Sequence, residues 1–240
     1  MALGRVVALI AAGGQGTRMG GKVNKQFLAI EGQPILAHTL RPFESCSAVD
    51  EIVIVAPKEW LFFVAHEIVD TFGFSKVRRV VEGGPERQHS VYAGLRALDP
   101  QTEIVVIHDA VRPFVDAQMI ERVVGAARQS GAAIFAVRPR DTVKKGCGER
   151  VEATLRRDDL WLVQTPQAFR YTLILKAYEN AFAKGLIGTD DAVLVEWLGE
   201  EVTILEGHYW NLKITTPEDL EVARLLLAAR KSGAGKPEGS

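Results

Sequence analysis

Short apolar runs rich in β-branched residues alternate with segments of helical periodicity along most of this 240-residue chain. The apolar runs are Val6–Ile10, Ile52–Ala56, Val77–Val81, Ile104–Ile107, Ala132–Val137 and Val202–Leu205. Helical spacing of apolar residues occurs in Pro34–Phe43, Lys58–Asp70, Arg87–Leu98, Ala117–Arg128, Thr172–Ala183 and Pro217–Ala228. Strands that alternate with helices form parallel sheets covered on both faces. The alternation therefore predicts an α/β fold, with a mostly parallel, Rossmann-like sheet that binds ligands beyond the carboxyl ends of its strands.

One segment, Asp141–Arg157, breaks this alternation. Within it, 142–144 and Val151–Leu155 alternate polar and apolar residues on either side of a turn at Gly146–Gly148. This pattern predicts a β-hairpin. Because an isolated hairpin is marginally stable, we predict a projecting arm that packs on another subunit. A loose surface insertion is the alternative.

Length and composition set the outer limits of the interpretation. We predict one domain over residues 1–229, followed by a disordered tail at 230–240, which is poor in apolar residues. The formal net charge of −1 argues against binding to nucleic acid or to an anionic membrane, since both need a positive field. No apolar run approaches the roughly 18 residues that span a bilayer. Cys46 and Cys147 lack metal-ligand spacing. We expect a cytoplasmic protein.

A glycine-rich loop follows the first predicted strand and reads Ala12-Gly13-Gly14-Gln15-Gly16-Thr17-Arg18, with Lys25 seven residues further on. Glycines let backbone N–H groups approach a phosphate closely, and the basic residues add positive charge. A dinucleotide-binding fingerprint would need glycine at Met19, and a P-loop would need Ser or Thr at Val23. The loop therefore favours phosphate binding of another kind, with a purely structural turn as the alternative.

Further motifs occur in order along the chain. They are Gly83-Gly84-Pro85-Glu86-Arg87, His108-Asp109-Ala110-Val111-Arg112-Pro113, Asp141-Thr142, Arg157-x-x-Leu160-Trp161, Thr165-Pro166-Gln167, Thr189-Asp190-Asp191-Ala192 and Asn211-Leu212-Lys213. Together with the glycine loop, this set spans roughly residues 5–228 and resembles the 2-C-methyl-D-erythritol 4-phosphate cytidylyltransferase family of nucleotidyltransferases. Gly13 stands where many members have alanine, and Asn24 where many have proline. These departures affect the shape of the loop and leave its charges in place.

The resemblance implies transfer of CMP from CTP to 2-C-methyl-D-erythritol 4-phosphate, with release of pyrophosphate. The product would be 4-diphosphocytidyl-2-C-methyl-D-erythritol, a precursor in the non-mevalonate isoprenoid pathway. One alternative is a ribitol 5-phosphate cytidylyltransferase, against which Arg157-x-x-Leu160-Trp161 and Thr189–Ala192 favour the first acceptor. Another is a non-catalytic nucleotide-binding homologue. The joint presence of Arg18, Lys25, Asp109 and Lys213 argues against that alternative.

The implied reaction needs positive charge rather than a general base. A phosphomonoester has a second pKa near 6, so the attacking oxygen is already ionised at neutral pH. The resemblance assigns Arg18 and Lys25 to stabilising the transition state, and Arg157 and Lys213 to positioning the acceptor phosphate. Solvated surface charges are the alternative for each, and Arg156 is a second candidate for the role of Arg157.

The resemblance also assigns each of the remaining site residues to one of the two substrates. The residues that would bind the nucleotide are Ala12, Gly13, Gly14, Gly16, Gly84, Ser90 and Ala110. The residues that would bind the acceptor are Asp109, Arg112, Thr142, Thr165 and Thr189. Ser90 could instead cap a helix, and each threonine could be structural. We expect Mg²⁺ held mainly by the CTP triphosphate, with Asp109 at most a water-mediated contributor and no protein metal ligand. The family's arms interlock in a homodimer, which would carry Arg157 into the partner's site.

Overall fold

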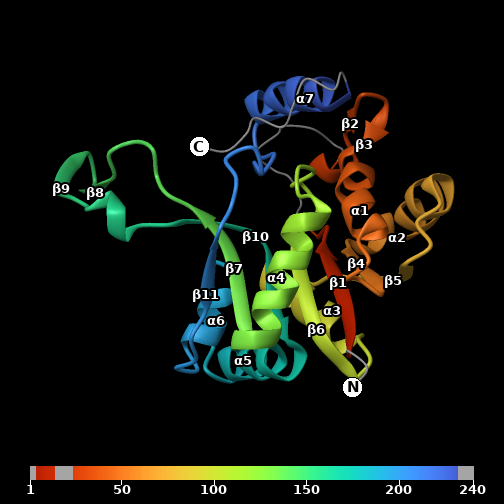
Figure 1. Cartoon of the computed structure of the whole chain (residues 1–240), viewed down its shortest axis with the longest axis horizontal. Helices are drawn as coiled ribbons and strands as arrows, with labels where there is room; N and C mark the ends of the chain where they lie inside the picture. Colours follow the sequence, from red (N-terminus) through yellow and green to blue (C-terminus); the bar gives the residue numbers. More distant parts are fainter. Residues whose placement is uncertain (1–3, 14–23, 232–240) are drawn as a thin grey trace.

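A seven-stranded sheet organises the chain, in the order β11-β7-β10-β6-β1-β4-β5 (Figure 1). The computed structural model describes residues 4–13 and 24–231. The strands are β1 (Arg5–Ala11), β4 (Glu51–Ala56), β5 (Val77–Glu82), β6 (Thr102–Asp109), β7 (Ala132–Val137), β10 (Leu162–Arg170) and β11 (Thr203–Glu206). Neighbouring strands are parallel except where β10 pairs with β6 and β7. The predicted mostly parallel α/β sheet is confirmed. The predicted apolar runs lie in its strands, except that β11 begins one residue after the predicted Val202.

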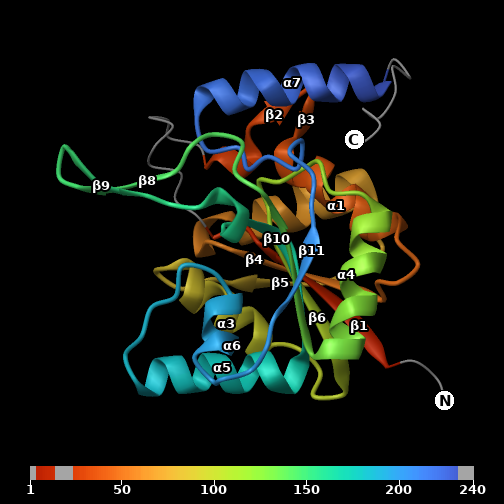
Figure 2. The same ribbon diagram turned by 60° about the vertical axis from the view of Figure 1, so that its left-hand side comes forward.

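Helices cover both faces of the sheet (Figure 2). One face carries α1 (Ile35–Ser45) and α4 (Ala117–Ser130), and the other carries α3 (Arg87–Arg96), α5 (Tyr171–Ala183) and α6 (Ala192–Glu196). Successive side chains of a strand point to opposite faces. Accordingly, Val6, Ala8 and Ile10 pack with α1 and α4, while Val7 and Leu9 pack with α3 and α5. This alternation determines which strand residues pack against each layer of helices.

The predicted helix at Lys58–Asp70 differs in geometry from the prediction. The chain is helical over this range, but it divides into a 3₁₀ turn η3 (Lys58–Trp60), a short α2 (Leu61–Phe63) and a π-helical stretch η4 (Val64–Asp70). Within the part of the chain that the structure describes, every helix is too short or too polar to cross a membrane.

A third apolar cluster lies beyond the carboxyl ends of the strands. It joins α7 (Pro217–Lys231) to the small hairpin of β2 (Ala29–Ile30) and β3 (Gln33–Pro34), with Phe114 and Ile214 between them. Helix α7 extends two residues into the predicted disordered tail because Arg230 packs over the Phe114 ring, 5.1 Å from its centroid. The rest of that predicted tail, 232–240, lies outside the described residues.

Strand β10 is absent from the sequence-based prediction. Its middle reads Gln164-Thr165-Pro166-Gln167, which resembles a loop because proline cannot donate to a sheet and glutamine favours no strand. In the structure its pairing with β7 shifts register between Gln164 and Gln167, which accommodates Pro166. Bulges of this kind re-aim side chains next to functional sites. Here the shift lies beside the end of β6.

The predicted hairpin is present within Asp141–Arg157. Strand β8 (Lys144–Cys147) pairs antiparallel with β9 (Arg150–Thr154), and the pair projects from the sheet as an arm (Figures 1 and 2). A 2.8 Å ion pair between Lys145 and Glu152 links the two strands. Exposed pairs of this kind contribute about 1 kcal/mol or less, so the arm gains little stability from its own contacts.

Two helical glycines provide a matched test of the packing that places α3. A Cβ at Gly94 would lie 2.4 Å from Leu9 Cδ1 and 2.7 Å from Val55 Cγ2, whereas a Cβ at Gly125 of α4 would meet open space among the described residues. Alanine favours a helix over glycine by about 1 kcal/mol, but overpacking a core costs roughly 1–3 kcal/mol. We therefore expect Gly125→Ala to raise the free energy of unfolding in urea and Gly94→Ala to lower it. Equal stability of the two variants would contradict the close approach of α3 to β1 and β4.

Candidate active site

A cavity of about 410 Å³ opens at the carboxyl end of β6, against β10 and the start of α3. It brings together five predicted site residues from distant parts of the sequence. Its lining includes Asp109, Arg112, Thr165, Thr189 and Lys213, together with Arg87, Gln164, Gln167, Asp190 and Glu196. These residues come from five separate segments, so the cavity exists only in the folded chain. Its lining is a mixture of cations, carboxylates and neutral hydrogen-bonding groups.

The Asp109 carboxylate is the electrostatic centre of this cavity. Lys213 Nζ lies 2.9 Å and Arg112 Nε 3.5 Å from its Oδ2 atom, while Arg87 Nε lies 3.2 Å from Oδ1. Burial alone would raise the pKa of Asp109, but the charges of Arg87, Lys213 and Arg112 outweigh burial and hold that pKa well below its usual range. Asp109 is therefore a fixed anion at neutral pH, surrounded by three cations.

A hydrogen-bonded chain behind Asp109 fixes the end of β6. The Asp109 amide donates to Thr165 Oγ1 over 3.1 Å, and Thr165 Oγ1 lies 3.0 Å from His108 Nδ1. His108 Nε2 lies 3.0 Å from the Arg112 carbonyl, which can only accept, so this nitrogen carries the proton. Burial lowers the pKa of His108 to about 4, so the ring is neutral at pH 7. His108 is thus a buried hydrogen-bonding residue, and Nδ1 accepts from the Thr165 hydroxyl.

A second network joins the start of α3 to the Thr189 loop. Arg87, the first residue of α3, donates through Nη1 and Nη2 to the two oxygens of Asp191, over 2.9 and 2.7 Å. Asp191 is fully buried and also accepts from the Tyr178 hydroxyl. Beside it, Gln167 donates to Asp190 over 2.8 Å. These contacts hold the 189–191 loop against the mouth of the cavity.

The predicted nucleotide-binding residues that the structure describes gather next to this cavity. Cβ atoms built on Gly13 and Gly83 would lie 2.7 and 2.8 Å from the Ser90 hydroxyl oxygen, so both loops contact the same side chain. Ser90 in turn donates to the Gly84 carbonyl over 3.1 Å. Ala110 joins the same edge, since its amide donates to the Ala11 carbonyl. Larger residues at either glycine would displace Ser90.

Ala12 and Lys25 lie on either side of a stretch that is not described. The Ala12 carbonyl accepts a 2.6 Å hydrogen bond from Gln26, which follows Lys25 in the 3₁₀ turn η2 (Lys25–Phe27). This bond joins η2 to the end of β1 and so places the neighbouring Lys25 near that end. The predicted residues Gly14, Gly16 and Arg18 lie outside the described residues.

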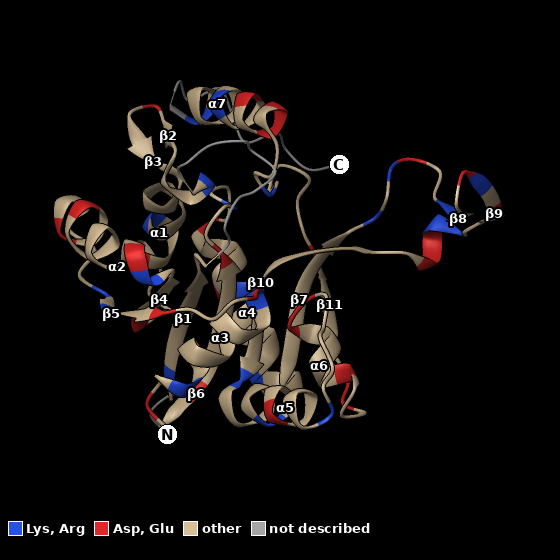
Figure 3. Cartoon of the chain, turned by 180° about the vertical axis from the view of Figure 1, so that it is seen from behind, with Lys and Arg blue, Asp and Glu red and all other residues tan. Residues whose placement is uncertain are grey.

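Thr142 and Arg157 stand apart from the cavity, on the projecting arm. Both are exposed, and the arm carries its charged residues well away from the sheet (Figure 3). Arg157 donates to the Arg140 carbonyl over 3.0 Å at the base of the arm. Its neighbour Arg156 lies 3.6 Å from Asp159. Within one chain, Thr142 and Arg157 therefore lie away from the five predicted site residues that line the cavity.

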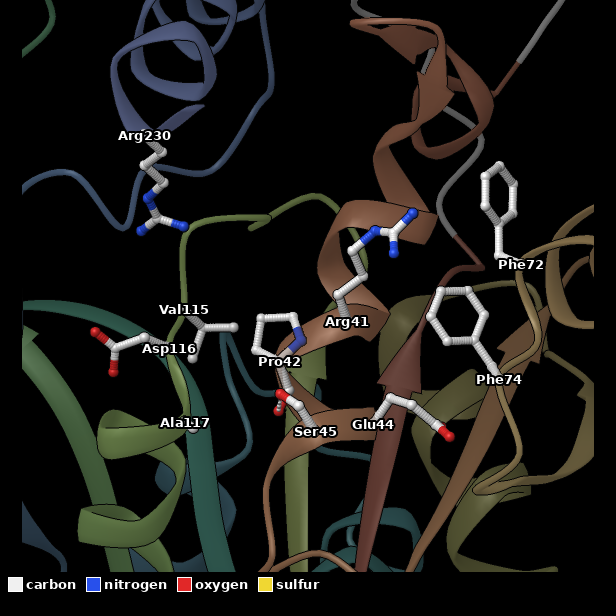
Figure 4. A pocket seen from close by; sticks show the side chains of 10 residues that line it. All are labelled: Arg41, Pro42, Glu44, Ser45, Phe72, Phe74, Val115, Asp116, Ala117 and Arg230. Atoms are coloured by element: carbon white, nitrogen blue, oxygen red, sulfur yellow. Dashed lines mark hydrogen bonds between the residues drawn. The ribbon is translucent and has the colours of Figure 1, made fainter. Parts of the chain in front are cut away.

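A second, larger cavity of about 540 Å³ lies between α1, α4 and α7 (Figure 4). Its lining includes none of the predicted site residues. Its two arginines are already bound, because Arg41 donates to Gln33 over 2.7 Å and Arg230 donates to the Phe114 carbonyl over 2.8 Å. Glu44 accepts from Ser75 and from the Lys76 amide. The polar groups of this cavity thus serve packing, and the chemistry belongs to the smaller one.

The side chains of the site also bear on possible metal binding. Among the described residues, no group of three or more His, Cys, Asp or Glu side chains is placed to hold an ion. Both oxygens of Asp109 already contact cationic side chains. The described residues therefore form no acidic cluster of that kind, and the Asp109 oxygens are engaged by side chains of the site.

Sequence reasoning assigned no role to several residues that build the site. Arg87, Gln167 and Asp191 lie inside the motifs that carry the family resemblance, and those motifs could have marked them as site residues. Tyr178 lies in a predicted helix outside every motif. Their partners lie far along the chain, since Arg87 and Asp191 are 104 positions apart. Local patterns carry no information about such pairs.

Known proteins resemble this chain along nearly its whole length. The family model for 2-C-methyl-D-erythritol 4-phosphate cytidylyltransferase, IspD, matches residues 6–229. The chain is 48% identical to the enzyme of that name from Geotalea uraniireducens, over 95% of this chain and 99% of the relative. It is 50% identical to the enzyme from Geobacillus kaustophilus, over 93% and 97% of the two chains.

A solved structure agrees with this likeness. The crystal structure of 4-diphosphocytidyl-2C-methyl-D-erythritol synthase from Anaerococcus prevotii superimposes with a TM-score of 0.83 and 35% identity, covering 94% of this chain and 96% of that one. The fold, the ordered motifs and the comparisons all agree on one family of cytidylyltransferases. The chain belongs to the 2-C-methyl-D-erythritol 4-phosphate cytidylyltransferase family.

Proposed function

We propose that the cavity at the end of β6 and the adjacent glycine loops carry out the reaction of this family. An oxygen of the phosphate of 2-C-methyl-D-erythritol 4-phosphate attacks the α-phosphorus of CTP. A new P–O bond forms, the bond to the β-phosphate oxygen breaks, and pyrophosphate leaves. The observation that carries the proposal is the anionic Asp109, held among Arg87, Arg112 and Lys213 beside the Gly13, Gly83 and Ser90 contact.

The division of labour follows from charge and hydrogen bonding. Fixed cations bring two polyanions together and stabilise the charge that develops at phosphorus. We assign Arg18 and Lys25 to that charge, and Lys213 to the acceptor phosphate. Asp109, Thr165 and Thr189 present oxygen atoms to the hydroxyl groups of the acceptor, with Arg112 beside them. Ala12, Gly13, Gly84, Ser90 and Ala110 face the nucleotide.

A divalent metal fits this proposal as a companion of the nucleotide. We propose Mg²⁺, bound mainly by the triphosphate, with Asp109 at most a water-mediated contributor. When bound, the ion neutralises phosphate charge and orients the leaving pyrophosphate.

The arm supports the further proposal of a homodimer. Val151 on β9 and Leu162 at the start of β10 are 65% and 52% exposed, and a two-stranded hairpin is marginally stable by itself. A two-fold pairing of arms would bury such residues and bring Thr142 and Arg157 to the partner's acceptor site, giving two equivalent composite sites. We propose that one domain, 1–229, acts in this way in the cytoplasm, without nucleic-acid or membrane partners.

The first prediction tests the reaction and the choice of nucleotide. We expect release of pyrophosphate from CTP with 2-C-methyl-D-erythritol 4-phosphate, much slower release with ribitol 5-phosphate, and little with UTP, ATP or GTP. A small backbone-lined pocket excludes purines, and specific polar contacts reject the wrong pyrimidine edge. Ser90→Ala should lower the ratio of kcat/KM for CTP to kcat/KM for UTP by roughly ten-fold. Ser130→Ala, at the far end of α4, should leave this ratio unchanged. Equal turnover of UTP and CTP by the wild-type protein would contradict the assigned pocket.

The second prediction concerns the transition state. Lys25→Ala and Arg18→Ala should each lower kcat by roughly 10²-fold or more, since each removes a preorganised cation from developing charge. Lys58→Ala, which removes an exposed lysine from a similar 3₁₀ turn, is the matched control and should retain wild-type turnover. Circular dichroism would establish that the variants are folded. Wild-type rates in a folded Lys25→Ala protein would remove Lys25 from the mechanism.

The third prediction tests whether Arg157 acts across the dimer. Inactive Lys25→Ala protein mixed with inactive Arg157→Ala protein, under conditions of subunit exchange, should regain part of the activity. In a mixed dimer one composite site would carry both substitutions and the other neither. Arg156→Ala serves as the matched control and should be active by itself. Mixed dimers without recovered activity would place the action of Arg157 within its own subunit or outside the reaction.

A further inference from the structure

The two oxygens of the Asp109 carboxylate are held from different sides. Lys213 and Arg112, which line the acceptor part of the cavity, contact Oδ2 at 2.9 and 3.5 Å. Arg87, which begins α3, contacts Oδ1 at 3.2 Å. A carboxylate held at one oxygen can still rotate about its Cβ–Cγ bond, so the contact to Oδ1 fixes which lone pairs face the cavity. The orientation of Asp109 thus depends on where Arg87 is placed.

Arg87 is itself fixed by groups that do not reach the cavity centre. Its Nη1 and Nη2 atoms donate to the two oxygens of Asp191 in a bidentate pair, and the Tyr178 hydroxyl donates to the same carboxylate. Asp191 is fully buried, whereas Arg87 retains 32% of its side-chain exposure. Paired fork-to-carboxylate contacts impose geometry as well as charge. The pair leaves Arg87 Nε pointing at Asp109.

The geometry points to Arg87 as a positioning residue for the transfer reaction: pinned by Asp191 and Tyr178, it sets the rotation of the Asp109 carboxylate toward the acceptor. It thereby couples the helix that carries the nucleotide residue Ser90 to the loop that carries the acceptor residue Thr189. Arg87 acts through Asp109, and contact with a phosphate is not part of this role. The inference rests on the proposed acceptor role of Asp109.

Arg87→Lys is a sharp variant for testing this role. Lysine keeps the positive charge and most of the length, but it is a point charge that cannot serve two carboxylates in the fixed directions of a guanidinium. A fully buried carboxylate without a counterion is strongly destabilising, so the ammonium group of this variant should stay with Asp191 and release Asp109. The fold is kept and the Oδ1 contact is lost. Tyr178→Phe removes the hydroxyl that donates to Asp191. It should impair the placement of Arg87 in the same way, with a smaller effect on the acceptor KM.

Steady-state kinetics separate positioning from a general loss of structure. Arg87→Lys should raise the KM for the acceptor roughly ten-fold or more, as expected when a hydrogen bond to a charged group is lost, and leave the KM for CTP unchanged. Asp109→Asn should raise the acceptor KM as well, and the double variant should equal Asp109→Asn by itself, since residues acting through one contact are not additive. The matched control is Arg128→Lys, because Arg128 pairs with Glu103 at the opposite end of β6, 3.2 Å apart.

Additive effects of the two substitutions would overturn the inference, as would an unchanged acceptor KM in Arg87→Lys. A parallel rise of both KM values with a fall in Tm would also overturn it, because that pattern indicates loosening of the fold. Lack of pyrophosphate release by the wild-type protein, or an unchanged acceptor KM in Asp109→Asn, would instead defeat the proposed function or the acceptor role of Asp109.

A carboxyl ¹³C NMR titration decides the Arg87 link independently of turnover. The Asp109 signal, assigned by comparison with Asp109→Asn, should stay that of an ionised carboxylate where ordinary aspartates titrate, around pH 3.9. The charge of Arg87 lowers the pKa of Asp109. In Arg87→Lys the ammonium group should stay with Asp191, further from Asp109, so the Asp109 titration should move toward higher pH. An identical titration in both proteins would show that Arg87 does not hold Asp109.

Discussion

A carboxylate at the end of a central, buried strand is costly unless cations surround it, and the site is arranged around that requirement. Asp109 ends β6, which lies between β1 and β10 in the middle of the sheet. Its charge is balanced by Arg87, Arg112 and Lys213. Because those residues come from three other places in the sequence, satisfying one carboxylate brings the start of α3, the loop after β6 and the segment before α7 to one point. The cavity is the space that remains between them.

Hydrogen bonds to backbone carbonyls then hold those segments close to one another. Asn211 donates to the Thr165 carbonyl over 2.9 Å, and the Arg112 guanidinium donates to the Asn211 carbonyl over 2.8 Å. Asn211 and Thr165 are nearly inaccessible to solvent, where an unmet polar group costs about 1–3 kcal/mol. These bonds therefore resist displacement, and the ends of β6 and β10 keep a constant separation. Such preorganisation is what stabilisation of a charged transition state requires.

The sequence predicted the parts of this arrangement that local patterns encode. Apolar runs such as Ile104–Ile107 identify parallel strands because both faces of those strands are covered. Strand β10 escaped prediction because Pro166 and its polar neighbours resemble a loop, and the register shift that accommodates them arises from pairing with β7. In the site, Asp109 and Lys213 stood out through family motifs. The partnership of Arg87 with Asp191 could not, since it joins residues 104 positions apart.

The cavity around Asp109 and the projecting arm are stabilised by different kinds of interaction. Around Asp109, buried charges and hydrogen bonds fix each group, whereas the arm has an exposed Lys145–Glu152 pair and apolar side chains such as Val151 that face solvent. Exposed pairs contribute little to stability, so the arm would gain stability from a surface that packs against it. If a second copy provides that surface, as we propose, assembly supplies the residues that a single chain leaves away from its cavity. The chain would then build the charged centre by folding and complete the acceptor site by association.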